Sequence, residues 1–247
     1  MRRSLTLLVL ALSLAAAGCT RAEDADFGKR VRAYLLQHPE VIEEAVQKLQ
    51  DKRQAEAEAE AKQAMARAQA ALPKFRAALE RDPRDFVANP AGKITVTEFY
   101  DYRCPHCINA APQVLDIIKS NPDVRFVFKE LPIFGAVSEH AARTAIAAKT
   151  KGGDYLGLYR SFMSTQPLDD AAIDRLGKAH GVEPAEASAP AVIKAANEQM
   201  ADAHKLARAL SIDGTPTFVI GDTLVPGEDM DSVRAAIEKA RRGDKTS

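Results

Sequence analysis

Residues 94–107 read ITVTEFYDYRCPHC, and this stretch decides the fold. Its first half alternates β-branched and aromatic residues, which predicts a β-strand over residues 94–100. The next segment, Ile108 to Lys119, carries apolar residues at helical spacing and stops at Asn121-Pro122. The C-x-x-C motif therefore lies where a strand passes into a helix. Pro105 suits the first helical turn, because its missing N–H would have no intrahelical partner there.

The place of Cys104 at this helix start predicts its chemistry. Unpaired N–H groups and the helix dipole favour an anion, so the Cys104 thiolate should be stabilised and its pKa lowered. His106 can add positive charge or a hydrogen bond in the same direction. A stable thiolate makes the disulfide a ready oxidant. We therefore expect Cys104 to be the exposed, attacking sulfur and Cys107, one turn deeper, to be the resolving thiol.

A zinc site is the main alternative use of such a cysteine pair. Structural zinc needs four ligands, and the sequence contains neither a second C-x-x-C nor a His-x₃₋₅-His pair. The scattered histidines and methionines show no metal-binding spacing. The sequence thus favours redox chemistry with no metal and no cofactor.

Two separated motifs carry a resemblance to a known family. EFYDYRCPHC (residues 98–107), with GTPTFVI (residues 214–220) far downstream, resembles the DsbA family of thioredoxin-fold oxidoreductases over roughly Asn89 to Arg242. The resemblance implies that Thr215-Pro216 is a cis bond facing the cysteines, where substrate binds. It also implies that Glu98 is a buried acid that moves protons to and from Cys107. From the alternating strand alone, a solvent-facing Glu98 remains the alternative.

The amino terminus predicts export. A short basic end, Met1 to Arg3, precedes an apolar run from Leu5 to Ala17 that is shorter than the roughly 20 residues of a membrane span. We expect a signal peptide over residues 1–22 and a periplasmic protein. Cleavage before Cys19, in a box resembling that of bacterial lipoproteins, would create a lipid anchor. Cleavage after Ala17 or Ala22 would leave a soluble protein, and both outcomes stay open.

Residues 23–49 predict a helical oligomerisation segment. Apolar residues recur at intervals of three and four, and His38-Pro39 interrupts them, so two short helices or one kinked helix are expected. The phrase YLLQHPE (residues 34–40) resembles the opening of the ScsC-like (suppressor of copper sensitivity) branch of the family. The resemblance implies a homotrimer assembled through residues 26–49.

Residues 50–88 predict a helical spacer. Gln50 to Ala71 consists almost wholly of strong helix formers without an apolar stripe, which is typical of a helix surrounded by solvent. About 20 residues would span roughly 30 Å. Leu72-Pro73 is expected to break the helix, and a last short helix should precede Asp82-Pro83. The alternative is a surface helix lying on the catalytic domain.

The remaining chain predicts an α/β thioredoxin domain over residues 89–242 with inserted helices. A turn opens it at Asn89, and a second, parallel strand over Val124 to Lys129 completes a βαβ unit. The later expected elements are four or five inserted helices (about 138–210), a hairpin (217–220 and 223–225), a closing helix (230–241) and a tail (243–247).

Composition limits the function further. Lys plus Arg and Asp plus Glu each number 34, so no net charge favours binding to nucleic acid or a membrane surface. Three hypotheses follow. The first is an exported, oligomeric disulfide isomerase or reductase acting on protein substrates with a membrane redox partner. The second is a monomeric DsbA-like oxidase, and the third is a copper(I)-binding protein using the same cysteine pair.

Overall fold

The computed structural model describes residues 26–244. The predicted signal peptide, Cys19 and the last three residues of the predicted tail lie outside the described residues. The chain divides into two compact units, Met1–Ala61 and Lys62–Ser247.

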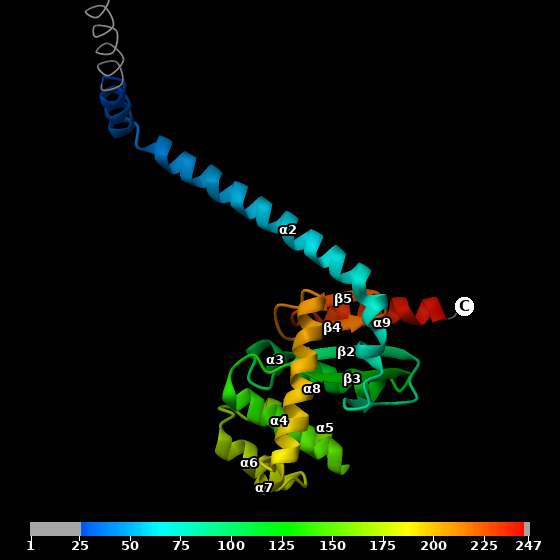
Figure 1. The fold of residues 1–247 in the computed structure, drawn as a ribbon. Helices are drawn as coiled ribbons and strands as arrows, with labels where there is room; N and C mark the ends of the chain where they lie inside the picture. The colour runs from blue at the N-terminus through cyan, green and yellow to red at the C-terminus, as the bar shows by residue number, and fades with distance from the viewer. Residues whose placement is uncertain (1–25, 245–247) are drawn as a thin grey trace, which may run out of the picture. The chain divides into compact units, whose positions relative to one another are not determined.

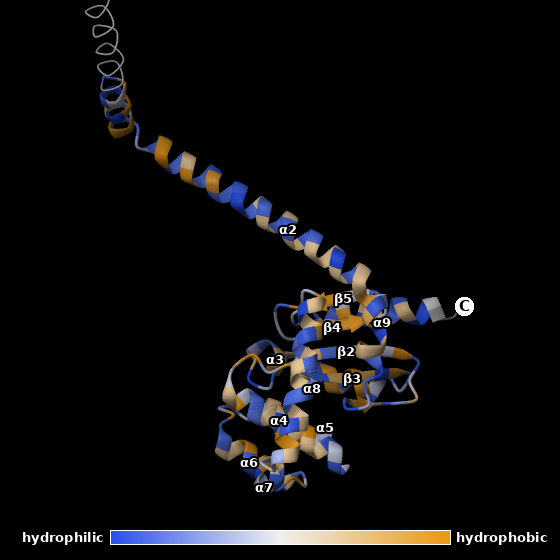
Figure 2. Cartoon of the chain, viewed as in Figure 1, coloured by the Kyte–Doolittle hydropathy of each residue, from blue (hydrophilic) through white to orange (hydrophobic). Residues whose placement is uncertain are grey.

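The described part of the first unit is helical. One helix covers residues 26–37, and α2 (Glu40–Glu80) begins after a break at His38 and Pro39, as predicted. Figure 2 shows apolar residues recurring along both helices. The large apolar side chains that are exposed to solvent are those of Phe27, Val31, Tyr34, Leu36, Ile42, Val46 and Leu49. This unit therefore presents an apolar surface that the single chain does not bury.

The carboxyl-terminal part of α2 belongs to the second unit and packs on its core. Pro73 lies inside α2, so the predicted break at Leu72-Pro73 and the separate short helix are wrong. Leu72 and Leu79 are buried with Ala68 in one apolar cluster. Burial of a leucine contributes roughly 2 kcal/mol, and two such contacts offset the roughly 3 kcal/mol cost of an interior proline. A docking face therefore exists here, which the composition did not indicate.

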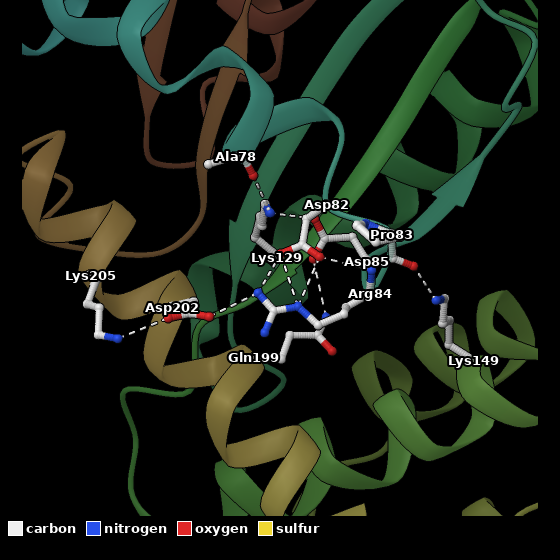
Figure 3. Close-up of polar contacts among 10 residues, drawn as sticks. All are labelled: Ala78, Asp82, Pro83, Arg84, Asp85, Lys129, Lys149, Gln199, Asp202 and Lys205. Atoms are coloured by element: carbon white, nitrogen blue, oxygen red, sulfur yellow. Dashed lines mark hydrogen bonds and ion pairs between the residues drawn. The ribbon is translucent and has the colours of Figure 1, made fainter.

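Side chains of the second unit satisfy the last carbonyl groups of α2. Helix ends leave carbonyls without intrahelical partners, and α2 has no basic residue in its own last turn. Lys129 Nζ donates to the Ala78 oxygen at 2.6 Å (Figure 3), and Arg125 donates to the Glu80 oxygen at 2.7 Å. Lys129 also forms a buried ion pair with Asp85. These contacts fasten the end of α2 and the following turn to strand β3 (Val124–Glu130).

A five-stranded sheet with the order β1-β3-β2-β4-β5 forms the centre of the second unit. Strands β2 and β3 are parallel, and the other neighbours are antiparallel. The strands are β1 (Phe86–Ala88), β2 (Ile94–Tyr100), β3 (Val124–Glu130), β4 (Thr217–Ile220) and β5 (Thr223–Pro226). The sequence did not predict β1, because three residues are too few for a periodic signal. The sheet therefore begins before the expected start of the catalytic domain at Asn89.

Helices cover both faces of the sheet (Figure 1). Helices α3 (Pro105–Ser120) and α9 (Met230–Asp244) join the apolar cluster on one face, and the ends of α2 and α8 (Pro190–Ala209) join the cluster on the other. Five helices between β3 and β4 form the predicted insertion; besides α8 they are α4 (Ala136–Lys151), α5 (Tyr155–Ser164), α6 (Asp170–Ala179) and α7 (Pro184–Ala187). Among residues 26–244, no helix is long and apolar enough to cross a membrane.

Candidate active site

The C-x-x-C motif lies at the amino-terminal end of α3. Cys104 is the N-cap residue, and Pro105 begins the helix, as the sequence predicted. The Ile108 N–H donates to the Cys104 carbonyl oxygen at 3.0 Å and closes the first helical turn. The Cys104 sulfur lies at this helix start, where the backbone N–H groups of His106 and Cys107 favour negative charge.

The loop before β4 lies against this turn. The Cys104 thiol donates to the Thr215 carbonyl oxygen at 3.1 Å, and the Thr215–Pro216 bond is cis, as expected. Cys104 is only 2% exposed and Cys107 is 0% exposed. The prediction that Cys104 is an exposed sulfur is therefore wrong, because the Thr215 segment covers it. Contact with Thr215 nevertheless places the predicted substrate-binding loop beside the predicted attacking sulfur.

The two thiols have pKa values shifted in opposite directions. The pKa of Cys104 is lowered to about 5, first by a hydrogen bond from Cys107, with help from Thr215 and from backbone N–H groups, against the effect of burial. Burial is the largest cause that raises the pKa of Cys107 far above its usual range, followed by its hydrogen bond to Cys104 and the charge of Glu98. Cys104 is thus the thiol that ionises first, and as a thiolate it no longer donates to the Thr215 oxygen, whereas Cys107 keeps its proton.

The imidazole ring of His106 has another partner. Its Nδ1 atom lies 3.2 Å from Glu228 Oε1 on the surface. The group of His106 that lowers the pKa of Cys104 is the backbone N–H. The position in the helix turn, more than the nature of the side chain, therefore accounts for the effect of His106 on Cys104.

Glu98 faces the core and not the solvent. It is 0% exposed, and neither carboxyl oxygen has a hydrogen-bond partner among the described residues. Burial raises the pKa of Glu98 well above its usual range, and the charge of Glu130 adds to the effect. The expected burial is confirmed, and the charge of this carboxyl reaches Cys107, whose pKa it raises.

Glu130, which the sequence reasoning missed, lies in a cluster of tyrosines. Its Oε1 atom accepts hydrogen bonds from Tyr100 at 2.6 Å, Tyr155 at 2.7 Å and Tyr102 at 3.1 Å. Burial raises the pKa of Glu130 to about 8, although these hydroxyl groups favour its ionised form. The acid that ends strand β3, directly after Lys129 and before Leu131, was the available signal.

Asp101 was also missed and joins the active-site turn to the loop after β3. Its buried carboxylate accepts the backbone N–H of Arg103 at 2.7 Å and that of Ile133 at 2.6 Å. It also accepts the hydroxyl of Ser138 at 2.8 Å. An Asp shortly before a helix commonly binds nearby backbone N–H groups, so the sequence could predict that Asp101 is a turn residue. The sequence could not predict its contacts with Ile133 and Ser138.

A second constellation resembles a hydrolytic triad but lacks an essential part. Ser161 Oγ lies 2.9 Å from His180 Nε2, and His180 Nδ1 lies 3.1 Å from Asp154 Oδ2. Ser161 lies inside α5, where backbone N–H groups are used by the helix and cannot form an oxyanion hole. These contacts therefore attach α5 to the end of α6. Within residues 26–244, no group of three or more His, Cys, Asp or Glu residues could hold a metal ion.

Comparisons with known proteins match both parts of the chain. A family model described as DSBA-like thioredoxin domain matches residues 95–238, and one described as Copper resistance protein ScsC N-terminal domain matches residues 23–56. The thiol:disulfide interchange protein DsbA of Bordetella pertussis is 31% identical over 136 residues, which cover 53% of this chain and 64% of that protein. The chain thus matches less than two thirds of that relative's length.

Solved structures give the same picture. The catalytic domain of Proteus mirabilis ScsC superposes with a TM-score of 0.61 at 28% identity, covering 70% of this chain and 97% of that chain. Proteus mirabilis ScsC in a transitional conformation superposes with a TM-score of 0.62 at 27% identity, covering 89% and 97%. These similarities confirm the predicted thioredoxin fold with inserted helices.

Proposed function

The chain belongs to the DSBA-like thioredoxin family, and on this premise we propose that it exchanges disulfides with protein substrates through Cys104 and Cys107. The observation that carries the proposal is the opposite shift of the two thiol pKa values, to about 5 for Cys104 and upward for Cys107. One sulfur is thus prepared as nucleophile and leaving group at neutral pH, while its neighbour holds a proton.

The proposed chemistry assigns one task to each group. The Cys104 thiolate attacks a substrate disulfide and forms a mixed disulfide, or the oxidised pair accepts attack at Cys104 by a substrate thiolate. When a substrate disulfide is reduced, Cys107 attacks the mixed disulfide and Glu98 takes its proton. When substrate thiols are oxidised, Cys107 is the leaving group and Glu98 supplies its proton. The backbone at Thr215 and Pro216 lies beside Cys104, where an extended substrate finds main-chain partners.

The first unit favours an oligomeric isomerase or reductase over a monomeric oxidase. Its exposed apolar side chains need a partner, and residues 23–56 match the ScsC N-terminal model. We propose that three copies associate through residues 26–49 in the periplasm. Several active sites then contact one misfolded substrate, which raises the effective concentration for repeated exchange. A membrane protein would keep the cysteines in the required redox state.

The oligomer proposal can be tested by truncation between the two units. Removal of residues through Ala61 leaves the buried Ala68, Leu72 and Leu79 in place, whereas a cut after Leu72 would remove core side chains. We expect trimeric full-length protein by light scattering, and a monomeric, redox-active chain from Lys62 onward. The truncated chain should lose reactivation of scrambled ribonuclease and gain dithiol oxidation.

Two results would replace this proposal with the monomeric oxidase. One is a full-length protein that runs as a monomer, and the other is a truncated chain that reactivates scrambled ribonuclease equally well. The copper(I) alternative remains as a third function because soft thiolates suit that ion. Under this alternative the cysteine pair binds copper(I) tightly and does not exchange disulfides. Full exchange activity in metal-free buffer therefore argues against it.

A further inference from the structure

Two buried carboxyl groups lie on the same face of neighbouring strands. Strands β2 and β3 are parallel, with Glu98 opposite Phe128 and Tyr100 opposite Glu130. Residues two apart on a strand share a face, so Glu98 and Glu130 are diagonal neighbours on the face that also packs against α3. Strand geometry places their Cα atoms about 8 Å apart.

The surroundings of the two carboxyl groups differ sharply. Glu130 accepts hydrogen bonds from three tyrosine hydroxyl groups at 2.6 to 3.1 Å. Neither oxygen of Glu98 has a hydrogen-bond partner among the described residues. Hydroxyl donors stabilise an ionised carboxylate, whereas a dry, unpartnered carboxyl favours its protonated form.

Two buried acids this close titrate as a coupled pair. Ionisation of one opposes ionisation of the other, so the first negative charge settles on the site that stabilises it better. That site is Glu130, which has the three hydroxyl donors and, with a pKa of about 8, ionises before Glu98 as the pH rises. The proton that remains in the pair is then held on Glu98, the carboxyl whose charge acts on Cys107.

We propose that Glu130, held by Tyr100, Tyr102 and Tyr155, is a positioning residue that takes the negative charge of the pair and thereby keeps a proton on Glu98 for Cys107. The inference rests on the proposed function, because it concerns the proton transfer of disulfide exchange. Glu130 acts only through Glu98, and only Glu98 exchanges a proton with the reacting sulfur.

The step balances without any further reactant. A substrate thiolate attacks Cys104 of the oxidised protein, the new disulfide joins the substrate to Cys104, and the bond to Cys107 breaks with its electron pair on the Cys107 sulfur. The Glu98 carboxyl then transfers its proton to that sulfur and becomes a carboxylate. In the reverse direction, the Glu98 carboxylate removes the proton from Cys107 as this thiol attacks the mixed disulfide.

Carboxyl-labelled NMR can measure the coupling directly. The oxidised full-length protein, labelled with ¹³C at glutamate carboxyl groups, is titrated as wild type and as Glu130→Gln, with Glu98→Gln used to assign the signal. The amide of the Glu130→Gln variant still accepts hydroxyl hydrogen bonds but carries no charge. We expect the Glu98 midpoint to fall by about one to two pH units, since a like charge at this distance has been removed.

Conservative variants keep the test decisive if Glu130→Gln does not fold. Tyr155→Phe and Tyr102→Phe each remove one donor to Glu130, so charge should move toward Glu98 and lower its midpoint by a smaller amount. Tyr34→Phe is the control, because Tyr34 is an exposed residue of the first unit. A Glu98 midpoint that is the same in all these proteins overturns the inference.

A kinetic measurement separates this inference from the proposed function. The rate of glutathione attack on the oxidised protein, corrected for the thiolate fraction of glutathione, should decline with rising pH about one to two units earlier in Glu130→Gln. If wild-type protein exchanges disulfides and the variant has the same profile, the inference fails alone. If wild-type protein does not exchange disulfides, the proposed function fails, while the NMR titration still tests the pair.

Discussion

The thiol of Cys104 donates a hydrogen bond of 3.1 Å to the carbonyl oxygen of Thr215, a residue 111 positions further along the chain. The contact joins the start of α3 to the segment before β4, so two distant parts of the sequence form one reactive surface. It also covers the sulfur that is to react. A substrate chain must therefore take the place of this carbonyl contact when it reaches Cys104.

Thr215→Val should make the disulfide less oxidising without unfolding the protein. The Thr215 hydroxyl is buried without a hydrogen-bond partner among the described residues, and Thr215 is among the groups that lower the pKa of Cys104. Valine keeps the shape of this side chain without its hydroxyl. We expect a lower reduction potential in equilibrium with glutathione and a higher alkylation midpoint for Cys104. Thr223→Val, on the neighbouring strand β5, is the control and should leave both values unchanged.

Cys107→Ala should trap substrate on Cys104 as a mixed disulfide, and Cys104→Ala should not trap it on Cys107. The reason is the pKa of about 5 for Cys104 and the strongly raised pKa of Cys107. Non-reducing gels of protein exposed to oxidised substrate provide the measurement. In Cys107→Ala the alkylation midpoint of Cys104 should lie above that of the reduced wild type, because the largest stabilising hydrogen bond is lost. Equal trapping by both variants contradicts the assignment.

His106→Ala should lower the reduction potential only modestly. The backbone N–H of this residue persists in the variant, and the ring pairs with Glu228 at 3.2 Å. We expect a change smaller than about 30 mV, which is equivalent to about 1.4 kcal/mol for a two-electron couple. A potential equal to that of wild type would show that the helix start alone determines the stability of the thiolate.

The exposed side chains of Ile133 and Phe134 should contact protein substrates. They are 45% and 46% exposed, and their backbone N–H groups are fixed by Asp101 in the turn before Cys104. Ile133→Ser combined with Phe134→Ser should slow exchange with an unfolded protein severalfold and leave exchange with glutathione unchanged. Loss of both activities would indicate a damaged active site and contradict a role in substrate contact.

The buried pair of Lys129 and Asp85 should make stability depend on pH (Figure 3). Burial raises the pKa of Asp85 to about 6, above its value of about 4 in an unfolded chain. The folded protein then binds this proton more tightly, so this contribution to stability is full below about pH 4 and is lost as the pH rises through about 6. Urea unfolding of wild type and of Asp85→Asn with Lys129→Met should differ in this window.

The single variants provide the comparison for that pair. Asp85→Asn alone replaces the carboxyl group by a neutral amide, so it should remove the dependence of stability on pH in this window. The double variant, which removes both charges, should be more stable than the single one. Asp222→Asn removes an exposed ion pair with Arg76 and should change stability by less than about 1 kcal/mol. A pH profile that stays the same in the double variant contradicts the role of Asp85.

The active-site turn could be predicted from sequence because its signals are local. A strand, a C-x-x-C motif and Pro105 occur within a few residues, and each has one structural meaning at that spacing. The hairpin at Gly221 and the inserted helices were predictable for the same reason. Family resemblance added the cis bond at Pro216, which spacing alone would not indicate.

The missed features depend on contacts between distant residues. Strand β1 exists because its residues pair with β3, and α2 continues through Pro73 because Leu72 and Leu79 find a core. Cys104 is buried because the segment at Thr215, 111 residues further along the chain, lies over its sulfur. Glu130 looked like an ordinary charge after an apolar strand, and only the fold brings the tyrosine hydroxyl groups to it. Local patterns contain none of these pairings.

The tyrosine cluster has an optical consequence. The chain has no tryptophan and five tyrosines, of which Tyr100, Tyr102, Tyr155 and Tyr159 are buried in the core around Glu98 and Glu130. The ultraviolet fluorescence of this protein therefore comes mainly from these buried tyrosines, and no tryptophan fluorescence masks it. Hydrogen bonding to a carboxylate quenches phenol emission, so the unlabelled protein carries its own reporter of charge beside the redox pair.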